Sequence, residues 1–408
     1  MKCILTTTMI IVFNLISIAQ TENFWTKKND FGGLKRERAV AFSIGDYGYV
    51  GTGVDTAEVT LKDLWQYNPT FDTWSQKADL PGSARRDAVA FSINGKGYVG
   101  TGIDADESMG ANKLKDFWAY DPASNTWSQI ADFPGVGGLG LYFSTAFELD
   151  SKGYICGGKV GPNSYTNQLW EYKPNLNQWT QRANFPGGVR YQLASFSIGL
   201  YGYVGLGANQ DVFKKDFWKY NAGTDTWTAI SDLPASERGG SVTFSIGSRG
   251  FVCMGSDGGL LDDLWEYIPE IDYWVSRAPY GGSERKNAVG FVVNGKAYVG
   301  TGKGYSGKKS GMEEYTPMQL VGIEEQDFAH VNLYPNPTVS YFTIDHNNIQ
   351  PVKMEIYSIS GQLILAAQEV QDGEKIDVST FSSGSYIVRL YQANRQSVYS
   401  QHLLISDK

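Results

Sequence analysis

Short apolar stretches alternate with turns along most of the chain. The stretch AVAFSI at residues 39–44 has large side chains at Val40, Phe42 and Ile44 and small ones between them; it recurs at 88–93. A two-residue period rich in Val and Phe and bounded by Gly, Asp and Asn predicts β-strands. Both faces of these strands are uncharged, which is typical of a sheet packed on both sides.

Three more extended pieces follow this stretch in each copy of a repeat about fifty residues long. They read GYVGTG, DLWQYNP and DTWSQKADLP in the first copy. The last piece carries a tryptophan in every copy: Trp25, Trp74, Trp127, Trp179, Trp227 and Trp274. The other five tryptophans each stand nine residues before one of these. Six copies of a four-stranded unit predict a β-propeller.

The two ends of the repeat complement each other. Trp25 has no DLW-type strand before it, and the last copy, GMEEYTP at 311–317, has no tryptophan after it and carries Glu313 where the others have one. We therefore expect the strand around Trp25 to supply the fourth strand of the last blade, which would close the ring by hydrogen bonds. The predicted fold is all-β, a six-bladed kelch-type propeller over 21–317 followed by a small C-terminal β-sandwich.

The repeat resembles the kelch family, which includes the central domain of galactose oxidase. The shared features are glycines at the end of the second strand and a Tyr and a Trp in the third and fourth. Most copies read Gly-x-Gly where the family has adjacent glycines, which only Gly157 and Gly158 provide. The resemblance to the oxidase implies a copper site with two histidines, but all three histidines lie beyond residue 317. We therefore expect no copper site, no metal ligands and no cofactor.

The two termini predict export. Residues 1–20, MKCILTTTMIIVFNLISIAQ, have one lysine, an apolar stretch and small residues near the end, which is typical of a cleaved signal peptide and not of a transmembrane anchor. Residues 318–330 are predicted to be a linker. From 331 to 408 the chain resembles the type A sorting domain of the type IX secretion system, through LYPNPT at 333–338, the SGQ turn and the SGSYIV strand. The resemblance implies the secretion machinery as a partner and a secreted or cell-surface location.

Composition narrows the function classes. The 35 Lys and Arg against 43 Asp and Glu give a net charge of −8, so nucleic acid is not an expected partner. Aromatic residues at 14% and hydrophobic residues at 42% exclude a disordered chain.

Candidate ligand-binding residues fall on the face that carries the variable loops between the second and third strands. Arginines recur just before the first strands: Arg36, Arg85, Arg190, Arg238 and Arg285. They either form a ring at the channel mouth that binds carboxylates, or they pair with the aspartates that open the third strands. Comparison of the blades favours pairing, because the blade with Leu141 in place of Arg has Gln168 in place of Asp; Arg285, however, faces Gly311.

Loop aromatics provide a second set of candidates. Tyr142, Tyr191 and Tyr280 are expected on the same face, where they could stack against sugar rings. We therefore predict an exported binding module for a glycan or protein ligand, with no catalytic residue assigned. The alternative is a carbohydrate-active enzyme on the same propeller, such as a sialic acid-type mutarotase using a Glu–Arg pair.

Overall fold

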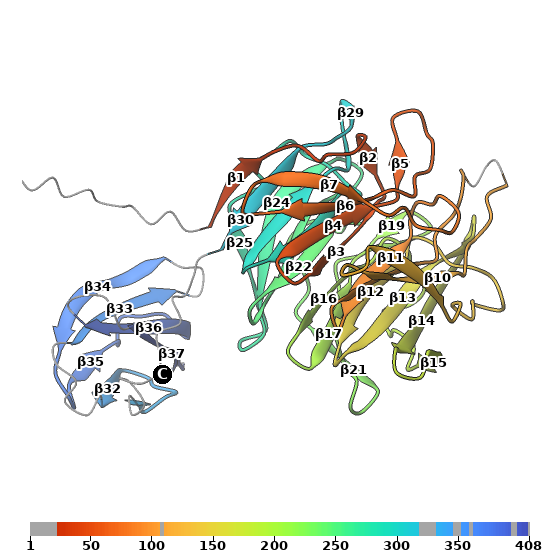
Figure 1. The fold of residues 1–408 in the computed structure, drawn as a ribbon. Helices are drawn as coiled ribbons and strands as arrows, with labels where there is room; N and C mark the ends of the chain where they lie inside the picture. The colour runs from red at the N-terminus through yellow and green to blue at the C-terminus, as the bar shows by residue number, and fades with distance from the viewer. Residues whose placement is uncertain are drawn as a thin grey trace, which may run out of the picture.

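The computed structural model describes residues 23–106, 110–317, 332–345, 352–358, 362–392 and 398–406. Between residues 23 and 317 the strands form six four-stranded antiparallel sheets, the blades, and three short two-stranded pairs (Figure 1). The predicted six-bladed propeller is therefore confirmed. The predicted signal peptide at 1–20 and linker at 318–330 lie outside the described residues.

The blades follow one another along the chain, each running from the innermost to the outermost strand. Blades 1 and 2 contain β3 (Val40–Ile44), β4 (Tyr47–Gly51), β6 (Leu64–Asn68), β7 (Thr73–Lys77), and β8 (Val89–Ile93), β9 (Lys96–Gly100), β10 (Phe117–Asp121), β11 (Thr126–Ile130). Blades 3 and 4 contain β12 (Thr145–Leu149), β13 (Lys152–Gly161), β14 (Ser164–Lys173), β15 (Gln178–Arg182), and β16 (Ala194–Ile198), β17 (Tyr201–Gly205), β20 (Phe217–Asn221), β21 (Thr226–Ile230). Blades 5 and 6 contain β22 (Val242–Ile246), β23 (Arg249–Gly255), β24 (Leu261–Ile268), β25 (Tyr273–Arg277), and β26 (Val289–Val293), β27 (Lys296–Gly300), β30 (Met312–Thr316), β1 (Phe24–Lys28).

The short pairs lie in the loops of the blades. They are β2 (Arg36–Glu37) with β5 (Val54–Asp55), β18 (Ala208–Asn209) with β19 (Val212–Phe213), and β28 (Lys303–Gly304) with β29 (Gly307–Lys308).

Neighbouring blades interlock through the alternation of large and small residues. The ring of Phe42 lies 5.2 Å from that of Tyr49 in its own blade, and its far edge faces Gly97 of the next blade. A Cβ added at Gly97 would lie 2.2 Å from the Phe42 ring, so only glycine fits there. The same contact with a phenylalanine of the preceding blade occurs at Gly48, Gly153, Gly202 and Gly250, which explains the glycine at the second position of these second strands.

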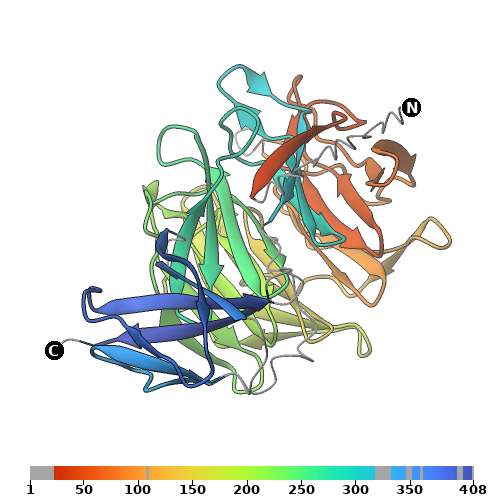
Figure 2. The ribbon, with the colours of Figure 1, turned by 90° about the vertical axis from the view of Figure 1, so that its left-hand side faces the viewer.

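The ring is closed by the N-terminal strand. Strand β1 pairs antiparallel with β30, with Trp25 opposite Tyr315 (Figure 2). The Trp25 indole donates to the carbonyl of Ala278 in blade 5 at 3.0 Å, and Lys28 forms an ion pair with Glu314 at 3.1 Å. Blade 6 is thus built from both ends of the propeller sequence.

Backbone hydrogen bonds also run around the central channel from blade to blade. The residue two positions before each first strand donates its N–H to the carbonyl of the equivalent residue in the preceding blade. The six bonds are Arg38 to Asn287 (3.0 Å), Asp87 to Arg38 (3.1 Å), Phe143 to Asp87 (3.1 Å), Gln192 to Phe143 (2.9 Å), Gly240 to Gln192 (3.4 Å) and Asn287 to Gly240 (2.9 Å). They form a closed circle that fixes the position of every blade at the channel mouth.

The C-terminal domain is the predicted sandwich. One sheet contains β31 (Asn332–Tyr334), β32 (Tyr341–Asp345) and β35 (Lys375–Asp377); the other contains β33 (Val352–Ser358), β34 (Leu363–Val370), β36 (Gly384–Gln392) and β37 (Val398–Ile405). Buried residues of both sheets, such as Phe342 and Val388, form one core, which is what defines a sandwich.

Loss of the closing tryptophan should open the ring. We expect Trp25→Ala to lower the free energy of unfolding of the propeller by about 3 kcal/mol, because it removes the contacts of the indole with Tyr280 and Tyr315 together with its hydrogen bond. Denaturant titration of the full chain measures this, with the exposed Lys27→Ala as control. An unchanged midpoint would show that β1 does not hold the ring together.

Candidate functional site

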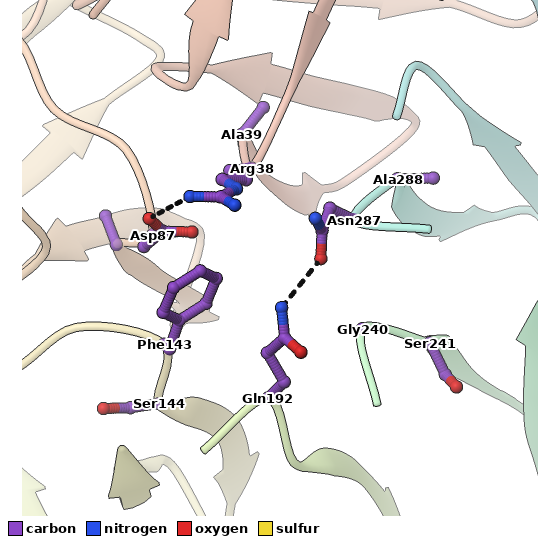
Figure 3. A pocket seen from close by; sticks show the side chains of 11 residues that line it. Arg38, Ala39, Asp87, Phe143, Ser144, Gln192, Gly240, Ser241, Asn287 and Ala288 are labelled. Atoms are coloured by element: carbon purple, nitrogen blue, oxygen red, sulfur yellow. Dashed lines mark hydrogen bonds and ion pairs between the residues drawn. The ribbon is translucent and has the colours of Figure 1, made fainter. Parts of the chain in front are cut away.

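The channel mouth is a small open hollow of about 120 Å³. Each blade lines it with the residues that precede its first strand: Arg38, Ala39, Asp87, Ala88, Phe143, Ser144, Gln192, Gly240, Ser241, Asn287 and Ala288 (Figure 3). One residue per blade is the donor of the hydrogen-bond circle. The site is therefore a ring of six equivalent backbone positions, each occupied by a different type of residue.

These six residues share an unusual backbone conformation. Their φ angles lie in the left-handed region, for example 59° at Arg38, 54° at Phe143 and 52° at Asn287. Five of the six are not glycine, and the left-handed region costs such residues roughly 1 kcal/mol each. The circle of hydrogen bonds imposes this conformation. Glycine at 240 is thus not required by the backbone, and its effect is to leave blade 5 without a side chain at the mouth.

Blades 1 and 2 supply the charged side of the mouth. The Arg38 guanidinium lies 3.4 Å from the Asp87 carboxylate and 3.6 Å from that of Glu37, and its centre lies 4.8 Å from the Phe143 ring. Arg86 lies 3.7 Å from the same carboxylate oxygen of Asp87 that faces Arg38. Burial raises the pKa of Asp87 to about 6, although both arginines lower it. Asp87 can therefore exchange a proton near neutral pH.

Two side-chain amides form the opposite side. Gln192 donates to the Asn287 side-chain oxygen at 3.3 Å (Figure 3). Asn287 in turn donates to the Glu37 carboxylate at 2.9 Å. The first bond joins blades 4 and 6 past Gly240, where a Cβ would lie 2.6 Å from the Asn287 oxygen. It is long and links neutral groups, so a ligand hydroxyl can replace it at small cost.

Aromatic rings continue from the mouth over blades 3 and 4. Phe143 lies 6.0 Å from Tyr191, which stacks on Tyr165 at 5.2 Å and 15°. The Lys159 ammonium lies 5.4 Å from the Tyr191 ring and 5.5 Å from the Tyr142 ring. This group provides an aromatic surface beside the hollow.

The five predicted arginines do not line the mouth; they are buried within the blades. Arg36 binds Asp63 with two bonds of 2.6 Å, and Arg85, Arg190 and Arg238 bind Asp116, Asp216 and Asp263 at 2.5 to 2.6 Å. All five arginines, Arg285 included, are at most 4% exposed. The hypothesis of a guanidinium ring at the mouth is corrected accordingly: four of these arginines are internal partners of aspartates, because each guanidinium points away from the channel into its own blade.

The predicted tyrosines are placed differently from one another. Tyr142 and Tyr280 are 1% and 3% exposed, so they offer no open ring face, and the Tyr280 ring lies under Arg285 at 4.8 Å. Tyr191 is only partly buried and belongs to the aromatic surface next to Phe143.

Sequence reasoning missed the residues that do line the mouth. Arg38 stands two positions after Arg36, and Asp87 two after Arg85. A usable signal was present, because this position carries a different residue in every copy, whereas the arginine two positions earlier recurs in five of the six copies. In a repeat protein such a position does not serve the shared scaffold, and this marks it as a candidate for binding.

Metal or thiol chemistry has no support in the described part of the chain. No group of three or more His, Cys, Asp or Glu side chains there could hold a metal ion. Cys156 and Cys253 are free and buried in strands β13 and β23, and burial raises the pKa of both thiols. Both cysteines therefore act as small core residues.

Comparison with known proteins identifies the C-terminal domain. Residues 332–406 match the model of the secretion system C-terminal sorting domain. The chain is therefore cargo of the type IX secretion system. It interacts with that machinery, crosses the outer membrane and resides on the cell surface or outside the cell. No helix in the described ranges has the length and apolarity to cross a membrane.

Two further similarities are more limited. The structure of YjhT superposes with a TM-score of 0.61 at 14% identity, over 72% of this chain and 97% of YjhT, which shows a shared propeller fold. Ulvan lyase NLR42 of Nonlabens ulvanivorans is 34% identical over 87 residues, or 21% of this chain. The match spans only 16% of the length of the lyase.

Removing a buried arginine should affect stability alone. We expect Arg238→Ala to lower the free energy of unfolding by about 3 kcal/mol or more, because it leaves Asp263 without its cation and opens a void. Denaturant titration measures the loss. A stable Arg238→Ala protein would argue against the pairing role.

The channel mouth should make stability depend on pH. Asp87 has a raised pKa in the folded state. Its contribution to the free energy of unfolding is therefore fully present below pH 4 and is lost as the pH rises through about 6. Asp87→Asn should therefore gain stability relative to the unchanged protein between pH 4 and 7, by up to about 3 kcal/mol. Thermal unfolding across this range tests it, with the exposed Asp46→Asn as control. A constant difference between Asp87→Asn and the unchanged protein would refute the raised pKa.

Proposed function

We propose that the protein is an exported, non-enzymatic binding module that receives the end of a glycan at the channel mouth. The observation that carries this proposal is the convergence of planar polar groups on Arg38, Gln192 and Asn287 with the aromatic face of Phe143 on one hollow. Sugars offer hydroxyls for such polar groups and C–H faces for an aromatic ring.

The size of the hollow supports an end-on mode of binding. Its volume of about 120 Å³ is small beside the ~300–1,000 Å³ of typical ligand pockets. It suits one substituent or one terminal sugar unit. The next units of the glycan would then lie across the face, where the stacked Tyr165 and Tyr191 offer an aromatic surface.

Export places the module where glycans occur. The signal peptide predicted at 1–20 and the sorting domain at 332–406 direct the chain out of the cell. By its name, the lyase that is 34% identical to this chain over 87 residues acts on a polysaccharide. The matched segment covers only 16% of the lyase, so the similarity supports a location among polysaccharides and not the activity of the lyase.

A sugar-acid mutarotase remains the second candidate, and Asp87 is the residue that favours it. With a pKa of about 6 it is suited to general acid–base catalysis near neutral pH. Its side chain is only 1% exposed, however, and lies between Arg38 and Arg86. This enclosure limits its contact with a substrate, which is why we favour binding over turnover.

One experiment separates the two functions. Calorimetry of the full chain with galactose, glucuronate, N-acetylneuraminate and oligosaccharides that end in these sugars measures binding, and NMR of the anomeric protons measures mutarotation. We expect binding without faster anomer exchange, and at least about tenfold weaker binding for Arg38→Gln and Phe143→Ala.

The control for these variants is Tyr305→Ala, since Tyr305 is 76% exposed and does not line the hollow. It should bind as the unchanged protein does. Faster anomer exchange that Asp87→Asn abolishes would establish the mutarotase instead. Binding to none of the sugars would refute the glycan proposal.

A further inference from the structure

Blade 6 departs from the arginine–aspartate pairing of the other blades. Blades 1, 2, 4 and 5 each hold a buried arginine against an aspartate, whereas blade 6 keeps Arg285 and has Gly311 at the aspartate position. The backbone confirms this equivalence. The Gly311 carbonyl accepts from the Thr301 N–H at 3.2 Å, as the Asp63 carbonyl accepts from the Thr52 N–H at 3.1 Å.

Among the residues that the structure describes, only neutral groups contact the Arg285 guanidinium. Its nitrogens donate to the carbonyls of Ser283 at 2.9 Å, Thr301 at 2.9 Å and Gly311 at 3.4 Å, and to the Ser283 hydroxyl at 3.5 Å. Arg285 is 4% exposed, and it forms no ion pair with any residue that the structure describes, unlike the equivalent arginines of blades 1, 2, 4 and 5. A buried cation without a direct counter-ion is costly and attracts an anion.

The space for that anion is open and reachable. A Cβ added at Gly311 would meet nothing within 4 Å, and its φ is not left-handed. In the other blades the side chain of the paired aspartate is 19% exposed at Asp63 and 30% at Asp216, so this position borders solvent. Blade 6 therefore presents the guanidinium of the repeated pair with the carboxylate missing.

We propose that Arg285 and Gly311 form a binding site for a carboxylate anion, distinct from the channel mouth. The other blades define the mode of binding: two parallel N–H···O bonds from one guanidinium to one carboxylate, as between Arg36 and Asp63. The ligand is a small carboxylate or the carboxylate of a sugar acid.

Glu313 tunes the affinity of this site. It stands where the other blades have a tryptophan whose indole also donates to the aspartate, as Trp65 does to Asp63 at 2.8 Å. The site therefore lacks one donor and has a negative charge nearby. Burial raises the pKa of Glu313, while Lys27 and Arg285 lower it, so it is close enough to Arg285 to compete with an incoming anion.

Thermal unfolding of the full chain at pH 7 tests the site, with sodium acetate compared with sodium chloride at equal ionic strength. We expect acetate to raise the Tm of the unchanged protein by about 2 °C or more. Gly311→Asp should raise the Tm without acetate and abolish the response, because its own carboxylate fills the site. Gly311→Ala leaves room for the ligand and should keep the response.

Two other variants sharpen the result. Asp63→Gly in blade 1 copies the arrangement of blade 6, so acetate should recover part of the Tm that this change costs. Glu313→Gln should tighten acetate binding about tenfold, because it removes a nearby like charge. Arg38→Gln at the channel mouth should leave the acetate response unchanged.

Several outcomes would overturn the proposal. These are an equal Tm in acetate and chloride for the unchanged protein, a persisting response in Gly311→Asp, or a response lost in Arg38→Gln. Repeating the thermal unfolding with sodium glucuronate distinguishes a site for small carboxylates from one that also accepts sugar acids. A response to both anions extends the site to sugar acids, and a response to acetate alone restricts it to small carboxylates.

Discussion

The closed circle of backbone hydrogen bonds at the channel mouth is the constraint on which the rest of the propeller depends. Each blade donates to the preceding one, and the last bond, from Arg38 to Asn287, joins the first blade to the sixth. A second circle joins the same blades, because a glycine at or near the end of each second strand donates its N–H to a carbonyl of the next blade, as Gly53 does to Arg85 at 2.8 Å. Both circles exist only if all six blades are present, so the fold closes as a whole.

Because this scaffold is built from backbone atoms, the side chains at the mouth are free to differ. The six left-handed residues keep the same φ whether they are Arg, Asp, Phe, Gln, Gly or Asn. The backbone circle therefore does not dictate which side chain stands at each of these positions. The buried arginine–aspartate pairs serve the opposite purpose, since each one joins a loop to a third strand inside its own blade.

Two blades deviate from the arginine–aspartate pairing of the others. Blade 3 loses both members of the pair, with Leu141 and Gln168, and replaces charge with apolar packing. Blade 6 loses only the aspartate. The first change removes both charges of the pair, whereas the second leaves Arg285 with only neutral partners among the described residues. A bound anion can take the place of the missing aspartate in blade 6, as we propose above.

The sequence by itself determined the fold and the route of export. Tryptophan spacing, glycine positions and the large-small alternation predict six blades because each reflects local strand geometry that every copy must repeat. Only the tertiary structure decided the site. Arg36 and Arg38 are two residues apart, yet one is buried against Asp63 and the other lines the channel. The reason is the left-handed backbone conformation of Arg38. It goes with the hydrogen bond from Arg38 to Asn287, a residue 249 positions away in the sequence, so the residues around Arg38 do not predict it.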